Sequence, residues 1–161
     1  MKIEYANEYR IDDAIDLRIE YFKEAYPEFT EEQETELRNN LREYFKYHLG
    51  KDCFVVLAIE NEIPIACAIL NVFSKAPNRR IPNGKYSEIY GVFTKKEKRN
   101  KGYATELIRE LIIISDRMDM SFIELEASRD GKPIYLNTGF VEVKNEYTFM
   151  KYHFDNREVL K

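Results

Sequence analysis

The sequence predicts the α/β (α+β) class, a mixed sheet with helices against its faces. Segments with apolar residues at helical spacing alternate with short segments rich in β-branched residues, in the order β-α-α-β-β-β-α-β-α-β-β. No internal repeat, low-complexity tract or linker interrupts that order. The length of 161 residues suits one domain with its own apolar core, so we expect a single domain over residues 1–161.

The chain is expected to open with a strand and a helix. Residues 3–5 fit a short strand, and Asp12 or Asp13 then offers a side-chain oxygen that can cap a helix. The apolar stripe of this helix consists of Ile15, Ile19, Phe22 and Tyr26.

A second helix and a hairpin follow. Thr30 and Gln33 form the pattern of a capping box, and the helix is expected to end at Gly50. Its apolar positions are Leu37, Leu41, Tyr44, Phe45 and Leu49. Residues 54–59 and 63–73 are rich in β-branched residues and flank a polar turn, which predicts a β-hairpin.

The central part of the chain is predicted to be a loop, a strand, a helix and a further strand. The loop is residues 74–85, which contain two prolines and a glycine, and the strand is residues 86–93. After a polar connection at residues 95–101, one face of a helix is formed by Ala104, Leu107, Ile108, Leu111, Ile114 and Met118. Residues 121–127 are predicted to return to a strand.

The last part is predicted to be a short helix and two strands. Pro133 suits the first turn of the helix and Gly139 closes it. Residues 140–143 and 147–154 are expected to pair as strands around Asn145.

Composition and charge exclude several classes of protein. The net charge of −4 gives no general attraction to nucleic acid or anionic lipid, and no apolar run approaches the roughly 18 residues that cross a bilayer. Cys53 and Cys67 lie in or beside apolar runs and are expected to be free buried thiols, which favours the cytoplasm. His48 and His153 are isolated from other metal ligands, so we expect no metal site.

The most informative stretch runs from the strand at residues 87–93 through a polar turn into a helix that begins near Gly102. A helix start has unpaired backbone N–H groups and partial positive charge, and a glycine lets an anion approach them closely. The cations around this turn, some of which can pair with further phosphates, are Lys95, Lys96, Lys98, Arg99 and Lys101. The pattern predicts a phosphate site, and the alternative is a solvated turn before a packed helix.

Residues 99–104 read Arg-Asn-Lys-Gly-Tyr-Ala and resemble the [RQ]-x-x-G-x-[GA] pyrophosphate loop of the GNAT superfamily of N-acyltransferases. The order of elements resembles that family over nearly the whole chain, and residues 134–140 are similar to its terminal Tyr-x-x-x-Gly-Phe motif. The resemblance implies a GNAT-like fold with a mixed, mostly antiparallel central sheet flanked by helices. It also implies acetyl-CoA as the cosubstrate.

In this family two neighbouring strands separate, and the thioester arm of the coenzyme inserts between them. The resemblance implies that the backbone of Val92, Phe93 and Thr94 binds the pantetheine arm. It implies that the pyrophosphate is bound by the main-chain amides of Arg99, Asn100, Lys101, Gly102, Tyr103, Ala104 and Thr105. Gly91 suits this place because a glycine permits a bulge or a close backbone approach, and ordinary packing is the alternative.

Glu88 and Tyr135 are the candidate catalytic residues. Glu88 lies in an otherwise apolar strand and, by strand alternation, is expected on the same face as Tyr90 and Val92. Burial would raise its pKa toward the range of a general base, and the alternative is a glutamate at the rim or in an ion pair. The resemblance implies that Tyr135 donates a hydrogen bond to the leaving thiolate. The weaker candidates, expected on a solvated strand face, are Glu124 and Glu126.

We therefore expect an N-acetyltransferase that transfers an acetyl group from acetyl-CoA to a primary amine by direct attack in a ternary complex. Its acceptor site is expected between the two N-terminal helices and the loop at residues 74–85. The alternative is an acyl-CoA-binding regulatory module without catalysis, and a nucleic-acid-binding domain is disfavoured. The sequence leaves open the identity of the amine and a homodimer through exposed strands.

Overall fold

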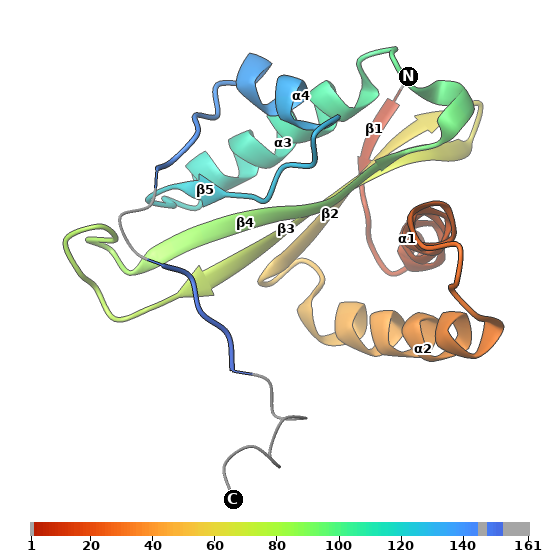
Figure 1. Cartoon of the computed structure of the whole chain (residues 1–161), viewed down its shortest axis with the longest axis horizontal. Helices are drawn as coiled ribbons and strands as arrows, with labels where there is room; N and C mark the ends of the chain where they lie inside the picture. The colour runs from red at the N-terminus through yellow and green to blue at the C-terminus, as the bar shows by residue number, and fades with distance from the viewer. Residues whose placement is uncertain (1, 145–147, 153–161) are drawn as a thin grey trace, which may run out of the picture.

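Five β-strands form one sheet in the order β1-β2-β3-β4-β5 (Figure 1). The computed structural model describes residues 2–144 and 148–152. The strands are β1 (Lys2–Tyr5), β2 (Cys53–Glu60), β3 (Ile63–Ser74), β4 (Lys85–Thr94) and β5 (Ile123–Glu124). Neighbours from β1 to β4 are antiparallel, and β4 and β5 are parallel. The predicted class, a mixed and mostly antiparallel sheet flanked by helices, is confirmed.

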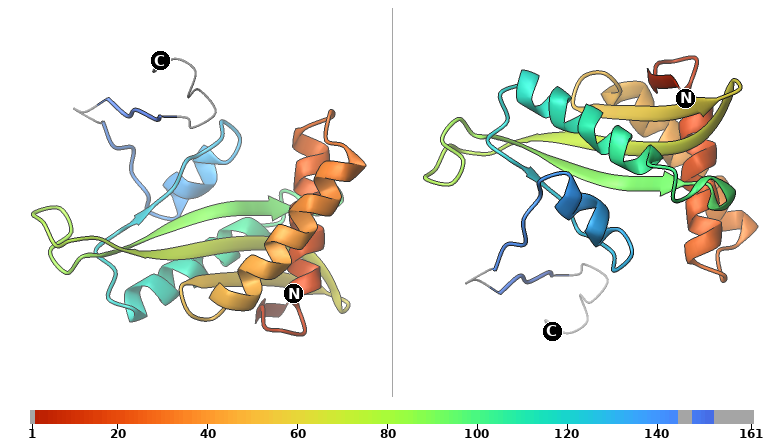
Figure 2. Two further views of the ribbon diagram at one scale, coloured as in Figure 1. Left: turned by 90° about the horizontal axis from the view of Figure 1, so that it is seen from below. Right: turned by 90° about the horizontal axis from the view of Figure 1, so that it is seen from above.

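Helices cover both faces of the sheet (Figures 1 and 2). They are α1 (Ile11–Ala25), α2 (Glu31–His48), α3 (Tyr103–Arg117) and α4 (Lys132–Asn137), with the 3₁₀ turn η1 (Lys96–Lys98) before α3. α1 and α2 lie on one side of the sheet, and α3 and α4 lie on the other. In the part of the chain that the structure describes, no helix is long and apolar enough to cross a membrane.

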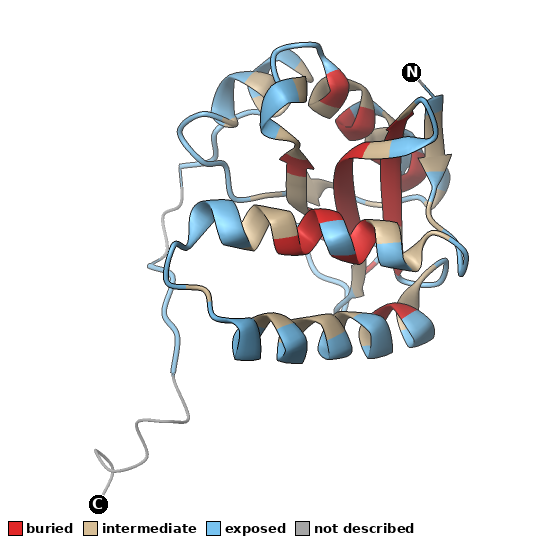
Figure 3. Ribbon diagram, turned by 90° about the vertical axis from the view of Figure 1, so that its right-hand side faces the viewer, coloured by how far each residue is buried: buried red, intermediate tan, exposed pale blue. Residues whose placement is uncertain are grey.

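The central strands are buried on both faces, which produces two apolar clusters. In β2, Val55 and Leu57 pack toward α1 and α2, whereas Val56 and Ala58 pack toward α3. Successive strand residues point to opposite faces, so burial on both sides explains the continuous apolar runs of β2 and β3. α2 contributes less to this core than α1 or α3, because Phe45 is its one buried residue and the rest of the helix is half-buried or exposed (Figure 3).

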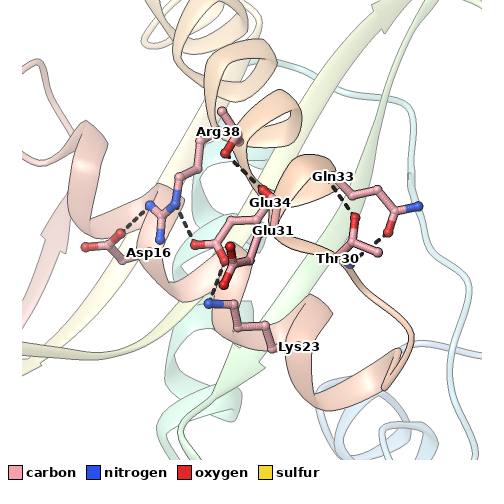
Figure 4. Close-up of polar contacts among 8 residues, drawn as sticks. Asp16, Lys23, Thr30, Glu31, Gln33, Glu34 and Arg38 are labelled. Atoms are coloured by element: carbon pink, nitrogen blue, oxygen red, sulfur yellow. Dashed lines mark hydrogen bonds and ion pairs between the residues drawn. The ribbon is translucent and has the colours of Figure 1, made fainter.

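α2 is fixed by its first turn and by ion pairs with α1 (Figure 4). The Thr30 hydroxyl accepts a hydrogen bond from the Gln33 N–H at 3.2 Å, and the Gln33 side-chain oxygen accepts one from the Thr30 N–H at 3.0 Å. The predicted capping box is therefore confirmed. Short ion pairs join α1 to α2 or brace α2, and they include Lys23 with Glu34, Arg38 with Glu34, and Arg38 with Asp16.

The start of α1 differs from the prediction. α1 begins at Ile11, so Arg10 is the N-cap residue and neither aspartate occupies that position. Asp12 and Asp13 lie inside the first turn instead, where negative charge is favourable beside the helix dipole. Asp13 accepts a hydrogen bond from the Arg10 guanidinium at 2.8 Å.

The hairpin, the following strand and the last short helix are confirmed as β2–β3, β4 and α4. The strand predicted at residues 121–127 is much shorter. Ile123 pairs with Ser87 and Glu124 pairs with Glu88, and the described residues make no further pair between these strands. As a result, β5 covers only the beginning of β4.

The two strands predicted at the end of the chain are wrong where the structure describes them. Neither residues 140–143 nor residues 148–152 form a strand, and Tyr147, Asn145 and residues 153–154 lie outside the described residues. A segment of alternating apolar residues forms a strand only where it can pair with a sheet edge and pack on an apolar layer. The edge strand β5 has two residues, so it provides few backbone groups for such pairing. The exposed apolar side chains of this segment include Val141, Val143, Phe149 and Met150.

Candidate functional site

The turn from β4 to α3 has the geometry of an anion-binding helix start. Gly102 is the N-cap residue of α3, with φ of 82° in the left-handed region. A Cβ atom on Gly102 would have no other heavy atom within 4 Å, so the space beside it is open. No side chain among the described residues caps α3, whose Glu106 N–H donates to the Gly102 carbonyl at 3.1 Å. The N–H groups available at this helix end are those of Tyr103, Ala104 and Thr105.

Three of the five cations around this turn are already paired with carboxylates. The pairs are Lys95 with Glu20, Lys98 with Glu60, and Arg99 with Glu24. Arg99 also donates from Nε to the Thr94 carbonyl at 2.9 Å, and Asn100 adopts a φ of 60°. Lys96 and Lys101 are exposed and form no ion pair within residues 2–144 and 148–152. The helix start and these two lysines are therefore the groups that remain for a phosphate.

β4 is interrupted by a bulge at Gly91. Tyr90 and Phe93 pair with β3 residues that are two positions apart, so Gly91 and Val92 stand opposite a single residue of β3. Gly91 has φ of 62°, which favours glycine, and the expected bulge is confirmed. Glu88 and Tyr90 face α2, but Val92 packs in the cluster beneath α3. The prediction that Val92 shares their face is wrong, because the bulge shifts the alternation by one residue.

The second half of β4 has a free edge. Its ladder with β5 ends at Glu88, so residues 89–94 have no strand partner on that side among the described residues. The residues implied in pantetheine binding, Val92, Phe93 and Thr94, all lie in this half of the strand. The Phe93 side chain is buried in the cluster under α1, and α4 lies beyond the free edge (Figure 2). Backbone groups on this edge can therefore pair with an extended ligand.

Tyr135 lies on α4 with a packed ring, and its hydroxyl is unpaired within the part of the chain that the structure describes. Its ring contacts Phe140 edge to face, with 5.9 Å between the ring centroids. A Cβ atom on Gly131 would lie 3.2 Å from the Tyr135 ring, so this glycine permits the close packing. Burial raises the pKa of Tyr135, and its hydroxyl has no hydrogen-bond partner among the described residues. A protonated phenol with a free donor is suited to a ligand.

Glu88 lies in a pocket of about 510 Å³ between α2 and the strands β3 and β4. It is half-buried and has no ion pair with any described residue. Burial, together with the negative charges of Glu124 and Glu126, raises the pKa of Glu88. The remaining lining residues are Leu37, Asn40, Leu41, Tyr44, Asn71 and Tyr90. The alternative of a glutamate paired with a cation is therefore not what the structure shows.

Two tyrosines give this pocket neutral hydrogen-bonding groups. The Tyr44 hydroxyl donates to the Asn71 side-chain oxygen at 3.1 Å. Burial raises the pKa of Tyr44 to about 12 and that of Tyr90 further still. Both phenols are protonated at neutral pH, so Glu88 is the charged group among the residues that line this pocket.

A second pocket of about 400 Å³ lies along α2 and shares Leu37 and Asn40 with the first. It lies between α1 and α2, where Phe22 contributes to its wall. Neither pocket is lined by a residue of the loop at 75–84, all of which the structure describes. The expected role of the two helices is thus supported by the pockets, but the expected role of the loop is not. The loop projects from the β3–β4 end of the sheet (Figure 1).

The cysteines and histidines add no further reactive site. Cys53 and Cys67 are free and buried, as predicted, and burial raises the pKa of each thiol to about 12. His48 Nδ1 lies 2.8 Å from Asp52, a carboxylate neighbour that the sequence analysis did not anticipate, and His153 lies outside the described residues. The described residues contain no group of three or more histidines, cysteines and carboxylates that could hold a metal ion.

Sequence analysis missed Arg18, which is buried beside the bulge of β4. Only 8% of its surface is exposed, and a Cβ atom on Gly91 would lie 2.7 Å from Arg18 Nη1. The signal was available, because Arg18 stands on the apolar stripe of α1, three residues after Ile15 and four before Phe22. A charged residue at a core position of a helix is unusual enough to mark a site.

The mixed sheet, in which β4 has a free edge and leads into an uncapped helix start, has the same fold as solved acetyltransferases. The family described as "Acetyltransferase (GNAT) family" matches residues 13–140, and the chain belongs to this family. The search of the curated proteins finds no match.

Solved structures share the fold at low sequence identity. A predicted acetyltransferase from Clostridium acetobutylicum, solved with acetyl-CoA, has a TM-score of 0.78 and 21% identity over 93% of this chain and 95% of that one. A GCN5-related N-acetyltransferase from Ralstonia eutropha JMP134 has a TM-score of 0.75 and 17% identity over 92% and 97%. An aminoglycoside 6'-N-acetyltransferase from Acinetobacter haemolyticus has a TM-score of 0.67 and 19% identity over 95% and 99%.

Proposed function

We propose that this protein transfers the acetyl group of acetyl-CoA to a primary amine by direct attack within a ternary complex. The observation that carries the proposal is the open start of α3 at Gly102, which adjoins the free edge of β4 along the chain. The start of α3 would bind the pyrophosphate, and the free edge of β4 would bind the pantetheine arm. Membership of the GNAT family and the acetyl-CoA complex of the Clostridium protein support this assignment.

The pyrophosphate would be bound by main-chain groups from Arg99 to Thr105, with Lys96 and Lys101 as the unpaired cations nearby. The ion pairs of Arg99 and Lys98 would hold the turn against α1 and β2. Because these pairs fix the turn before the anion arrives, little ordering accompanies binding. The backbone of Val92, Phe93 and Thr94 would pair with the amides of the pantetheine arm along the free edge.

Glu88 would serve as the general base. An alkylammonium with a pKa of about 10.4 costs about 4.6 kcal/mol to deprotonate at pH 7, so a base aids attack. Glu88 is supported by its place in the pocket, its lack of a cationic partner and its raised pKa. The amine proton would pass to the Glu88 carboxylate directly or through one water, as the nitrogen bonds to the thioester carbon.

Tyr135 would stabilise the leaving group. When the carbon–sulfur bond breaks, the thiolate of coenzyme A needs a hydrogen-bond donor or a proton. The Tyr135 hydroxyl supports this role because it is protonated and unpaired within the described residues. A phenol has a pKa about 1.5 units above that of a thiol, so hydrogen bonding contributes more than complete proton transfer.

The buried free thiols of Cys53 and Cys67 support a reducing compartment, and the cytoplasm is the location that we propose.

The test combines calorimetry with turnover. Titration of acetyl-CoA should release heat with the parent protein, and Gly102→Glu should weaken binding at least about 10-fold because a carboxylate would repel the pyrophosphate. Gly50→Glu is the matched control, since Gly50 has a φ of 75° and equally open space at the far end of α2. Equal binding by the Gly102→Glu and Gly50→Glu proteins would contradict the proposed coenzyme site.

Tyr135→Phe should retain acetyl-CoA affinity and lower turnover about 100-fold, because one donor to the thiolate is lost. Tyr47→Phe, on an exposed part of α2, should change neither quantity. Unchanged turnover in Tyr135→Phe would remove Tyr135 from the mechanism. Acetyl-CoA binding without acetylation of any amine in a broad panel would favour the regulatory module instead.

A further inference from the structure

Arg18 carries a buried charge, and two of the three guanidinium nitrogens have no hydrogen-bond partner among the described residues. It lies on α1 with 92% of its surface buried, since its exposed fraction is 8%. Neither Nε nor Nη1 of its guanidinium has a hydrogen-bond partner among the residues that the structure describes. A guanidinium has five N–H donors and stays charged at any physiological pH, so its burial normally requires an anion or several acceptors.

The groups that face Arg18 are aromatic rings and a glycine. Its guanidinium carbon lies 5.1 Å from the centroids of the Tyr21 and Phe22 rings and 5.7 Å from that of Tyr90. Nη1 lies against Gly91, where the position of an added Cβ atom is 2.7 Å away. These rings attract the cation through their faces, but they accept no conventional hydrogen bond.

The carboxylates that neighbour Arg18 on α1 are already paired with other cations. Glu20 pairs with Lys95 at 3.3 Å, and Glu24 pairs with Arg99 at 2.6 Å. Each of these pairs holds the β4–α3 turn, so neither carboxylate is released without loosening the proposed coenzyme site. The missing partner of Arg18 is therefore sought outside the chain.

Arg18 lies behind the walls of the two pockets beside α2. Tyr90 lines the first pocket together with Glu88, and Phe22 lines the second. Glu88 and Gly91 are three residues apart on β4, a separation of about 10 Å along a strand. One side of this region thus offers a carboxylate, and the other offers a guanidinium whose Nε and Nη1 have no partner among the described residues. The first pocket also contains two neutral tyrosines.

We propose that Arg18 binds a carboxylate of the acceptor, and that the acceptor is an amine that also carries a carboxylate, such as an amino acid. This inference rests on the proposed acetyl transfer. The planar guanidinium fits a carboxylate through two parallel hydrogen bonds, and the ligand's negative charge neutralises the buried cation. A phosphate ligand is disfavoured because the cations that pair with α1 near Arg18, Lys95 and Arg99, are already engaged by Glu20 and Glu24.

The experiment compares the twenty L-amino acids with their carboxamides, which keep the amine and remove only the negative charge. Binding is measured by calorimetry with and without coenzyme A, and acetylation is measured with acetyl-CoA. For at least one pair, the parent should bind and acetylate the acid at least about 10-fold better than the amide. Arg18→Met should abolish that preference, while Arg18→Lys should keep part of it because the charge remains.

The control variant is Arg42→Met, which removes an exposed guanidinium of α2 that pairs with Asp12 at 2.6 Å. It should leave the preference for the acid unchanged. Thermal unfolding and the affinity for acetyl-CoA should match the parent in both Met variants. A purely structural Arg18 would change the melting temperature and would not change the ratio between acid and amide.

Three outcomes overturn the proposal. The first is equal binding of acids and amides by the parent protein, and the second is an equal loss for both ligands in Arg18→Met, which would leave the ratio between acid and amide unchanged and indicate a structural role. The third is the absence of heat with every amino acid. Failure of the proposed acetyl transfer is recognised separately, as a lack of heat with acetyl-CoA, and the acid-to-amide comparison by calorimetry still decides the role of Arg18.

Discussion

The helices α2 and α3, which lie on opposite faces of the sheet, pack against it differently although their lengths are similar. α3 has 15 residues and buries six of them, whereas α2 has 18 residues and buries one. The buried α3 residues are Tyr103, Leu107, Ile108, Leu111, Ile114 and Ser115. α2 packs on the core through Phe45 and half-buried apolar side chains, is joined to α1 by ion pairs, and has both pockets along it.

This difference separates stability from recognition. Apolar burial by α3 fixes the helix whose first turn would bind the pyrophosphate, so that turn has a rigid support. The face with α2 leaves apolar and polar side chains accessible in concave sites, which is what the recognition of a small acceptor requires. A change beneath α3 should therefore lower stability, and a change beside α2 should alter acceptor use with little loss of stability.

Leu111→Ala should produce the largest effect on stability. Leu111 is fully buried under α3, and removal of its side chain should lower the free energy of unfolding by about 2–5 kcal/mol. Leu41→Ala on half-buried α2 is the matched change, for which we expect about 1 kcal/mol and a raised KM for the acceptor. Urea denaturation measures both, and equal losses would show that the two faces do not differ as described.

The parts of the fold that sequence predicted well are those with a local signal. Thr30 and Gln33 define the start of α2 by a contact within one turn, and the hairpin follows from two runs of β-branched residues. Gly102 and Gly91 indicated the helix start and the bulge, because both positions have a positive φ that residues with a side chain rarely adopt. The partial burial of Glu88 and the burial of both cysteines also followed from the apolar strands around them, whereas the pocket beside Glu88 was not predicted.

What sequence could not supply depends on contacts between distant segments. The bulge at Gly91 turns Val92 away from Glu88, and strand alternation alone gives no sign of the shift in register. The lysines of the β4–α3 turn looked equally available, but Lys95 and Lys98 pair with carboxylates of α1 and β2. Residues 140–143 have a strand-like pattern, but whether such a pattern forms a strand depends on the edge that is offered to it.

Glu88→Gln tests whether the pocket beside α2 is where the chemistry occurs. Loss of the base should lower kcat about 100-fold, and the affinity for acetyl-CoA should not change. In the parent, activity should fall with decreasing pH through the raised pKa of Glu88, because protonation removes the base, and this acidic limb should be absent in Glu88→Gln. The Glu88→Gln protein should be no less stable than the parent at neutral pH. A raised pKa means that folding disfavours the ionised Glu88, so the parent loses stability as the pH rises through the pKa of Glu88, and glutamine avoids this cost.

Glu126→Gln provides the matched control for this pH profile. Glu126 is exposed, and its negative charge contributes to the raised pKa of Glu88. Its neutralisation should move the acidic limb to lower pH while kcat at the plateau is retained. The titration would belong to another group if the acidic limb of the pH–activity profile did not move in Glu126→Gln. The same would follow if the limb persisted in Glu88→Gln.

Thr30→Ala should have the smallest effect, and it separates the support of α2 from the support of α3. The substitution removes the oxygen that accepts from the Gln33 N–H at 3.2 Å and should lower the free energy of unfolding by about 1 kcal/mol. Thr30→Ser keeps that acceptor and should restore most of the loss. Because α2 contributes little to the core, local opening should be confined to α2 and the pockets beside it, with faster amide hydrogen exchange there and unchanged exchange in α3. Acceleration in both helices would mean that the two faces unfold as one unit, and the division between a stabilising face and a recognition face would then be lost.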